Sequence, residues 1–163
     1  MVLRVRVCDI GVEFRCPDAD LAETVQLVFG SLPAADDFIS PALVYSVDRD
    51  PTTNVLTICR EGSQPLAVTS IEELLFRLDK DIILELQHRR ADLFYVHAGT
   101  VVHDGSAWAM SAPSGTGKST TVWALVCEGL RYVSDELAPI ERVGTEVRIH
   151  PYPRALNLKR APP

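Results

Sequence analysis

One short segment carries residues whose types and spacing suit phosphate chemistry: Ala112–Ser119, which reads APSGTGKS and fits the pattern [AG]-x4-G-K-[ST]. Gly115 and Gly117 allow the backbone to bend, so that successive N–H groups point at phosphate oxygens. Lys118 can reach the β- and γ-phosphates as a point charge, and Ser119 can place its hydroxyl on Mg2+. The segment therefore predicts a site for ATP and Mg2+.

The context of this segment supports the prediction, because such a loop must follow a strand and open a helix. Residues 106–112 have the pattern of a strand, and residues 119–129 have that of a helix ended by Gly129. The helix would direct its positive N-terminal end at the anion. The residues expected to bind the nucleotide are Ser114, Gly115, Thr116, Gly117, Lys118, Ser119 and Thr120.

Two adjacent acids, Asp135 and Glu136, are expected to return to the phosphate loop. The helix over 118–128 would lead away from the phosphates for about 16 Å at 1.5 Å per residue. The strand over 131–134 would lead back by about 13 Å. We expect Asp135 to bind Mg2+ together with Ser119, and Glu136 to orient or deprotonate an acceptor hydroxyl, with the reverse assignment left open.

The pattern of apolar and polar residues along the chain predicts an α/β fold of mixed α+β character. A P-loop core over 92–163 is expected to follow a small α+β region over 1–91. Asp18 is expected to cap the first helix, and Thr69 or Ser70 the second. The expected strands are 2–16 (a hairpin), 42–50, 54–62, 93–102, 106–112, 131–136 and 137–150 (a hairpin turning at Gly144); the expected helices are 16–32, 69–90 and 119–129; and 151–163 is expected to be irregular.

Composition narrows the function classes. The chain has 163 residues and a formal net charge of −6, which argues against nucleic acid as a partner. None of the four cysteines forms a C-x-x-C pair, so zinc is not expected. No apolar run approaches the roughly 18 residues of a membrane span, and the N-terminus lacks an apolar signal core. We therefore expect a cytoplasmic protein that does not bind membranes.

The segment Val96–Ile140, with its histidine, phosphate loop and paired acids, resembles the catalytic core of HPr kinase/phosphorylase and its bacterial relatives. The resemblance extends over residues 93–158 and implies a fold related to phosphoenolpyruvate carboxykinase. It also implies transfer of a phosphate to a serine hydroxyl of a protein. By this resemblance, His97 matches a histidine in the strand before the loop, and would assist near the transferred phosphate. Asp135 matches the first family acid, whereas Glu136 stands where the family has a second aspartate.

The resemblance implies that the core is incomplete, because the family's core continues well past the position of Pro163. Our first hypothesis is a kinase that uses ATP and Mg2+ to phosphorylate a hydroxyl of a protein or peptide. The alternatives are a non-catalytic ATP-binding sensor and an unrelated P-loop NTPase. The acceptor, the direction of phosphate transfer and the formation of a homo-oligomer are left open by the sequence.

Overall fold

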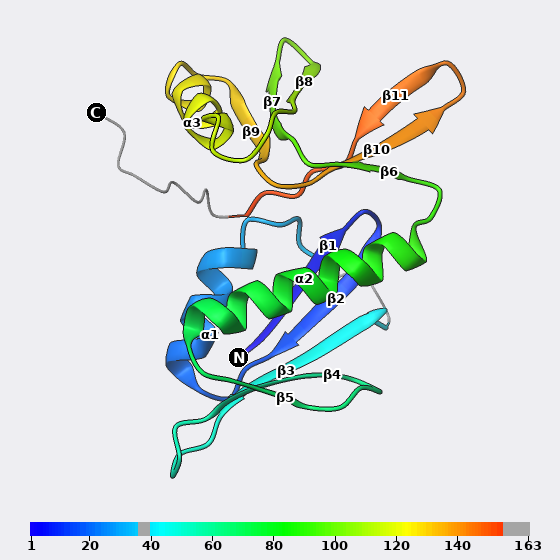
Figure 1. Ribbon diagram of the computed structural model, residues 1–163. Helices are drawn as coiled ribbons and strands as arrows, with labels where there is room; N and C mark the ends of the chain where they lie inside the picture. Colours follow the sequence, from blue (N-terminus) through cyan, green and yellow to red (C-terminus); the bar gives the residue numbers. More distant parts are fainter. Residues whose placement is uncertain (36–39, 155–163) are drawn as a thin grey trace. The chain divides into compact units, whose positions relative to one another are not determined.

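The computed structural model describes residues 1–35 and 40–154, and Figure 1 shows the order of their elements. The chain divides into two compact units, Met1–Arg89 and a second that begins at Arg90. Over the described ranges, three helices and eleven strands give a mixed α/β protein, as the sequence predicts. Most of the segment 151–163, which is expected to be irregular, lies outside the described residues.

The first unit combines a five-stranded sheet, in the order β1-β2-β3-β4-β5, with two helices. Neighbouring strands are antiparallel, except that β2 and β3 are parallel. The parallel pair is joined through α1, the crossover that parallel neighbours require. The elements are β1 (Val2–Val7), β2 (Ile10–Arg15), α1 (Ala19–Phe29), β3 (Leu43–Arg49), β4 (Leu56–Arg60), β5 (Leu66–Val68) and α2 (Ile71–Arg89).

Both helices of this unit pack against the same face of the sheet. Phe14 of β2 stacks on Phe29 of α1, with ring centroids 4.9 Å apart, and on Tyr45 of β3 at 5.9 Å. The Tyr45 hydroxyl donates a hydrogen bond of 2.8 Å to Asp81 of α2. The core is completed by the side chains that recur at helical spacing on α2, which are Leu74, Leu78, Ile82 and Leu86.

The two predicted helix caps are confirmed. Asp18 accepts a 2.9 Å hydrogen bond from the backbone N–H of Leu21. The Ser70 hydroxyl accepts one of 3.1 Å from the N–H of Glu73. In return, the Glu73 carboxylate accepts bonds of 3.0 and 2.9 Å from the backbone and hydroxyl of Thr69. Such reciprocal bonds satisfy donors that the first turn of a helix leaves unpaired.

The other face of the first sheet holds a buried acid. Glu13 is 3% exposed and accepts hydrogen bonds of 2.7 Å from the side chains of both Arg4 and Arg15. Burial alone would raise the pKa of Glu13, but the two arginines hold it below its ordinary value of 4.5. The sheet therefore has one charge cluster fixed on the face that the helices leave uncovered.

The second unit contains two three-stranded sheets, in the orders β11-β10-β6 and β8-β7-β9. All paired strands in these sheets are antiparallel. The predicted hairpin turn at Gly144 is confirmed, and this residue has a φ of +64°. The elements are β6 (Phe94–Val96), β7 (Gly99–His103), β8 (Ser106–Met110), α3 (Lys118–Cys127), β9 (Arg131–Ser134), β10 (Ala138–Val143) and β11 (Glu146–Ile149).

Two expectations need correction. The single strand expected over 93–102 is two strands, β6 and β7, and His97 lies between them rather than within a strand. The chain bends there because Val96 pairs with Ala138 in one sheet, while Gly99 pairs with Met110 in the other. The run of apolar residues continues across this change of partner. The short strand β5 was also not expected, because three residues are too few to show alternation.

Candidate nucleotide-binding site

The loop and the acids meet at one edge of the β8-β7-β9 sheet. Strands β8 and β9 lie on either side of β7 and are both antiparallel to it, so they end at the same edge. Gly99 pairs with Met110 at the end of β8, and Thr100 pairs with Ser134 at the end of β9. The glycine loop after β8 and the acids after β9 therefore begin at neighbouring positions along this edge of the sheet.

The loop has the backbone conformation that its glycines suggest. Gly115 and Gly117 have φ values of +84° and +96°, in the left-handed region where residues with a side chain are strained. Gly117 is also the N-cap of α3, and its carbonyl accepts the 2.8 Å hydrogen bond from Thr121 that opens the helix. The tip of the loop is exposed, which leaves Ser114, Gly115 and Thr116 accessible to a ligand.

Lys118 folds back across this loop. Its ammonium group donates hydrogen bonds of 2.7 Å to the carbonyl of Ala112 and 3.3 Å to that of Pro113. The Thr116 hydroxyl also donates to Pro113, at 2.8 Å, which braces the same turn. Over the part of the chain that the structure describes, no carboxylate pairs with Lys118. The lysine therefore holds a positive charge that only backbone dipoles offset.

Asp135 is a buried acid of the second unit. Its side chain is buried, with the residue 5% exposed, and neither carboxylate oxygen has a hydrogen-bond partner among the described residues. Its Oδ1 lies 3.6 Å from the point that a Cβ on Gly99 would occupy. A buried carboxylate without a partner is costly unless a cation or donors compensate for its lost hydration. This arrangement suits an acid that binds a cation.

Ser119 lies on the side of α3 that faces the same region. Val122, three residues later, is fully buried, and its Cγ2 lies 2.5 Å from the same Cβ point on Gly99. Residues three apart share a helix face, so Ser119 is one turn closer to the loop on the face that packs over Gly99. Serine and carboxylate oxygens are ligands that Mg2+ accepts, and phosphates and water complete its shell.

Across residues 1–35 and 40–154, no group of three or more His, Cys, Asp or Glu side chains converges as a metal site. The two protein oxygens of Ser119 and Asp135 would therefore be only part of a shell.

Glu136 takes the opposite direction from its neighbour Asp135. It is partly exposed, and its Oε2 lies 3.4 Å from Nδ1 of His97. The Ser111 hydroxyl donates a 3.2 Å hydrogen bond to the carbonyl of His97 and so ties this segment to the start of the loop. Of the expected residues, His97 and Glu136 are thus in contact, whereas Thr120 is exposed on the first turn of α3.

A local turn explains why the two acids separate. The Ser134 hydroxyl donates to the carbonyl of Leu137 and accepts a 3.2 Å hydrogen bond from its N–H. These bonds fold the chain immediately after β9, so that Asp135 turns inward while Glu136 remains at the surface. The sequence shows the pair of acids, but the separation depends on this serine.

Sequence reasoning missed three residues that shape the site. Gly99 leaves room for Val122 and borders Asp135, and Thr100 beside it is buried with a hydroxyl that has no partner in the described ranges. The third is Ser134, which forms the turn. A signal was available for the first of these, because a glycine inside a strand pattern often marks a close approach of another element.

Tyr132 lies near the two acids at this edge, and its pKa is raised. Burial raises its pKa, and the nearby charges of Asp135 and Glu136 raise it further, while Arg154 acts in the opposite direction. Its hydroxyl donates a 3.0 Å hydrogen bond to the carbonyl of Arg154. The tyrosine therefore remains a neutral donor beside the two acids.

No family model, curated protein or solved structure matches the chain. Over the described residues, no helix is both long and apolar enough to cross a bilayer. The function is therefore inferred from the chemistry and placement of the residues at the sheet edge.

Proposed function

We propose that the chain binds ATP with Mg2+ at the loop 114–120 and transfers the γ-phosphate to a hydroxyl of a protein or peptide. This is the activity that its resemblance to HPr kinase/phosphorylase implies, on a P-loop core of that type. The observation that carries the proposal is the buried Asp135 carboxylate, which has no partner in the described residues and lies at the edge where the loop begins.

Nucleotide binding follows from the loop. The first backbone N–H groups of α3 have no partner within the helix, so they can donate to phosphate oxygens together with the loop amides. Lys118 would exchange the carbonyls of Ala112 and Pro113 for phosphate oxygens, which are stronger acceptors of an ammonium proton. Thr120, on the first turn of α3, would contribute its hydroxyl to the bound nucleotide.

Ser119 and Asp135 would hold Mg2+ through one hydroxyl and one carboxylate oxygen. When bound, the ion supplies positive charge that offsets the charge gathering on the phosphates during transfer. The protein's part is to keep the Asp135 carboxylate dry and oriented. Its burial beside Gly99 and Val122 does this, because few alternative orientations are open to the side chain.

Glu136 would act on the acceptor. The acceptor oxygen forms the new bond to the γ-phosphorus, the bond from that phosphorus to the bridging oxygen breaks, and ADP leaves with the electron pair. The hydroxyl proton would pass to the carboxylate of Glu136, whose side chain is 41% exposed and therefore accessible to an acceptor. His97, 3.4 Å from that oxygen, would orient the carboxylate. Positioning and charge neutralisation would supply most of the acceleration.

A nucleotide sensor without turnover is the second candidate. The contact between Glu136 and His97 favours it, because a carboxylate engaged by a histidine is less available to accept a proton. Glutamate also stands where the resembled family has an aspartate, and its longer side chain changes the reach to an acceptor.

The test is an assay of ADP formation and phosphate transfer. The full chain would be incubated with ATP, Mg2+ and an array of serine-containing peptides, beside Lys118→Ala and Asp135→Asn. Asp104→Asn is the matched control, because this acid is 89% exposed in its side chain and lies in the turn between β7 and β8. Transfer by the wild type and the control alone supports a kinase. Binding of ATP without any transfer supports the sensor, and absence of ATP binding contradicts both.

A further inference from the structure

The first unit contains a groove of about 320 Å3 between α2 and the strands β4 and β5, which we call the α2–β5 groove. Its lining combines apolar side chains with charged ones, including Ile58, Leu66, Arg77, Lys80, Asp81 and Leu84. The volume is within the range of sites that bind small molecules or short peptide segments. The proposed nucleotide chemistry uses none of these residues.

The apolar floor of the groove results from the sheet register. Ile58 of β4 pairs directly with Leu66 of β5, so both side chains point to the face that carries α2. Ile58 is buried, whereas Leu66 is 44% exposed and Leu84 of α2 is 45% exposed. Both leucines line the groove, and neither is fully covered by the described residues.

On the helix side, the groove is lined by a single stripe of side chains along α2. Arg77, Lys80, Asp81 and Leu84 recur at helical spacing on α2, so they share one face. This stripe lies beside the core stripe of the same helix. The groove therefore has a fixed wall that presents two cations, one acid and one apolar residue to any ligand.

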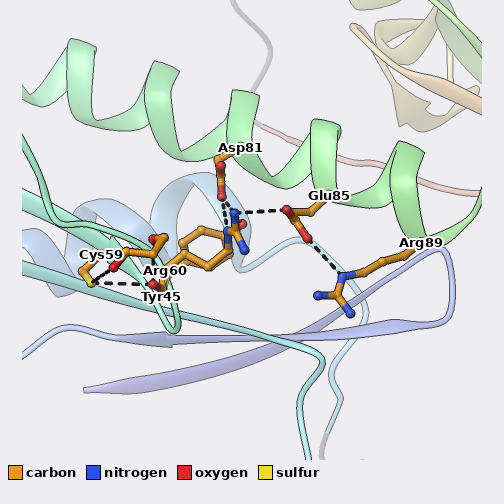
Figure 2. Close-up of polar contacts among 7 residues, drawn as sticks. Tyr45, Cys59, Arg60, Asp81, Glu85 and Arg89 are labelled. Carbon is orange, nitrogen blue, oxygen red and sulfur yellow. Dashed lines mark hydrogen bonds and ion pairs between the residues drawn. The ribbon is translucent and has the colours of Figure 1, made fainter.

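The acid on this wall, Asp81, already pairs with other side chains of the protein. Figure 2 shows Asp81 and Glu85 directed from α2 toward Arg60 of β4. The Asp81 carboxylate accepts hydrogen bonds of 2.8 Å from both Arg60 and Tyr45, and Arg60 also pairs with Glu85 at 3.1 Å. Burial raises the pKa of Tyr45, and its bond to Asp81 raises it further, so the tyrosine remains a donor.

The two cations of the wall, Arg77 and Lys80, make weaker contacts within the protein than Asp81 does. Arg77 reaches Glu73 at 3.5 Å across an exposed helix surface, a contact worth little in water. The Lys80 ammonium lies 6.0 Å from the centre of the Phe76 ring. With the acid satisfied by Arg60, the groove offers a positive charge above an apolar floor, which complements a ligand that is both acidic and apolar.

The position of β5 specifies the form of that ligand. It is the last strand in the sheet order, so one side of its backbone faces no other strand of the sheet. An extended segment can add to such an edge through main-chain hydrogen bonds. Alternate side chains of the added segment would then point into the groove, since side chains alternate between faces along a strand.

We propose that the α2–β5 groove binds an extended segment of a partner protein in which every second residue faces the groove, and in which these groove-facing residues include both acidic and apolar side chains. The apolar side chains pack between Leu66 and Leu84, the acidic ones approach Arg77 and Lys80, and the backbone of the segment pairs with β5. This inference does not depend on the nucleotide site.

The test uses a library of random octapeptides displayed on phage and selected on the immobilised full chain. Peptides that are enriched would be synthesised with a fluorescent label, and their affinities measured by anisotropy. The groove variants are the pair Arg77→Glu with Lys80→Glu, and separately Leu84→Ser. Arg148→Glu is the matched charge-reversal control, because this residue is exposed on β11 in the second unit. Melting curves establish that each variant is folded.

We expect the enriched peptides to carry at least two acidic residues at alternating positions. The charge-reversal pair should weaken their binding by about tenfold or more, and the control should change it by less than about twofold. Leu84→Ser should weaken binding while leaving the acidic preference intact. The proposal is overturned if no peptide is enriched over the bare support, if the enriched peptides are neutral or basic, or if the charge-reversal pair binds them as the wild type does.

Discussion

Nδ1 of His97 lies 3.4 Å from Oε2 of Glu136, a contact between the segment that joins β6 to β7 and the turn that follows β9. The preceding residue, Asp135, is instead buried without a hydrogen-bond partner among the described residues. Two neighbouring carboxylates therefore have different surroundings. Under the proposed function, this difference suits the buried one to binding a cation and the exposed one to accepting a proton.

Replacing Glu136 with glutamine should separate turnover from binding. The amide keeps the shape of the side chain but cannot accept the acceptor proton, so we expect phosphate transfer to fall by about a hundredfold or more. Affinity for ATP should change by less than about threefold, because among the described residues Glu136 forms its ion pair with His97, which lies outside the loop. His97→Gln should reduce transfer less severely. Transfer by Glu136→Gln at the wild-type rate would contradict the assignment.

Replacing Asp135 with asparagine should have opposite effects in the absence and presence of ligand. Without nucleotide, the variant loses a buried and unpaired charge, so we expect its free energy of unfolding to rise by about 1–2 kcal/mol. With Mg2+ and ATP at about 100 times the dissociation constant, the wild type should gain about 2.7 kcal/mol. The variant should gain much less. Denaturant titrations in both conditions, with Asp104→Asn as the control, measure these differences. Equal ligand stabilisation in Asp135→Asn and the wild type would exclude a metal role.

Gly99→Ala should destabilise the second unit. The new methyl group would lie 2.5 Å from Cγ2 of Val122, which is fully buried and has little room to move. Overpacking of this kind costs about 1–3 kcal/mol. Val122→Ala should recover part of the loss when it is combined with Gly99→Ala, and thermal melts of the two single variants and the double variant test this. A double variant less stable than either single variant would show that the close approach is not the cause.

Glu13→Gln should reduce stability in a pH-dependent manner. The pKa of Glu13 is lowered in the folded state, so its stabilising effect is present above the ordinary value of 4.5 and is lost as the pH falls through the folded-state pKa. We expect the variant to be less stable than the wild type by about 1–3 kcal/mol near pH 7. This difference should shrink at strongly acidic pH, as followed by urea titrations. A difference that does not vary with pH would mean that the arginine pairs do not stabilise the ionised form.

Local chemistry explains the parts of the fold that were predictable from sequence. Asp18 and Ser70 cap their helices through bonds that span a few residues, and Gly144 allows a turn within a single hairpin. The break at His97 was not predictable in this way. It depends on which sheet each side of the break joins, and Ala138, the partner of Val96, lies far along the chain from it.

In the candidate site, too, some features were predictable from the sequence and others were not. The return of Asp135 and Glu136 to the loop edge follows from the lengths of one helix and one strand. The burial of Asp135 instead requires Gly99 beside it and the turn made by Ser134. The α2–β5 groove was not anticipated, because it depends on the three-residue strand β5, which is too short to be recognised by alternation.

The most direct test of nucleotide binding is a calorimetric titration of the full chain with ATP, with and without Mg2+. It would be run beside Lys118→Ala and, as a control for loss of a surface cation, Arg148→Ala. We predict binding of one ATP per chain that Mg2+ strengthens, that Lys118→Ala weakens by about tenfold or more and that Arg148→Ala leaves unchanged. Failure of the wild type to bind, or equal binding by the wild type and Lys118→Ala, would contradict the proposal that this loop binds the phosphates of ATP.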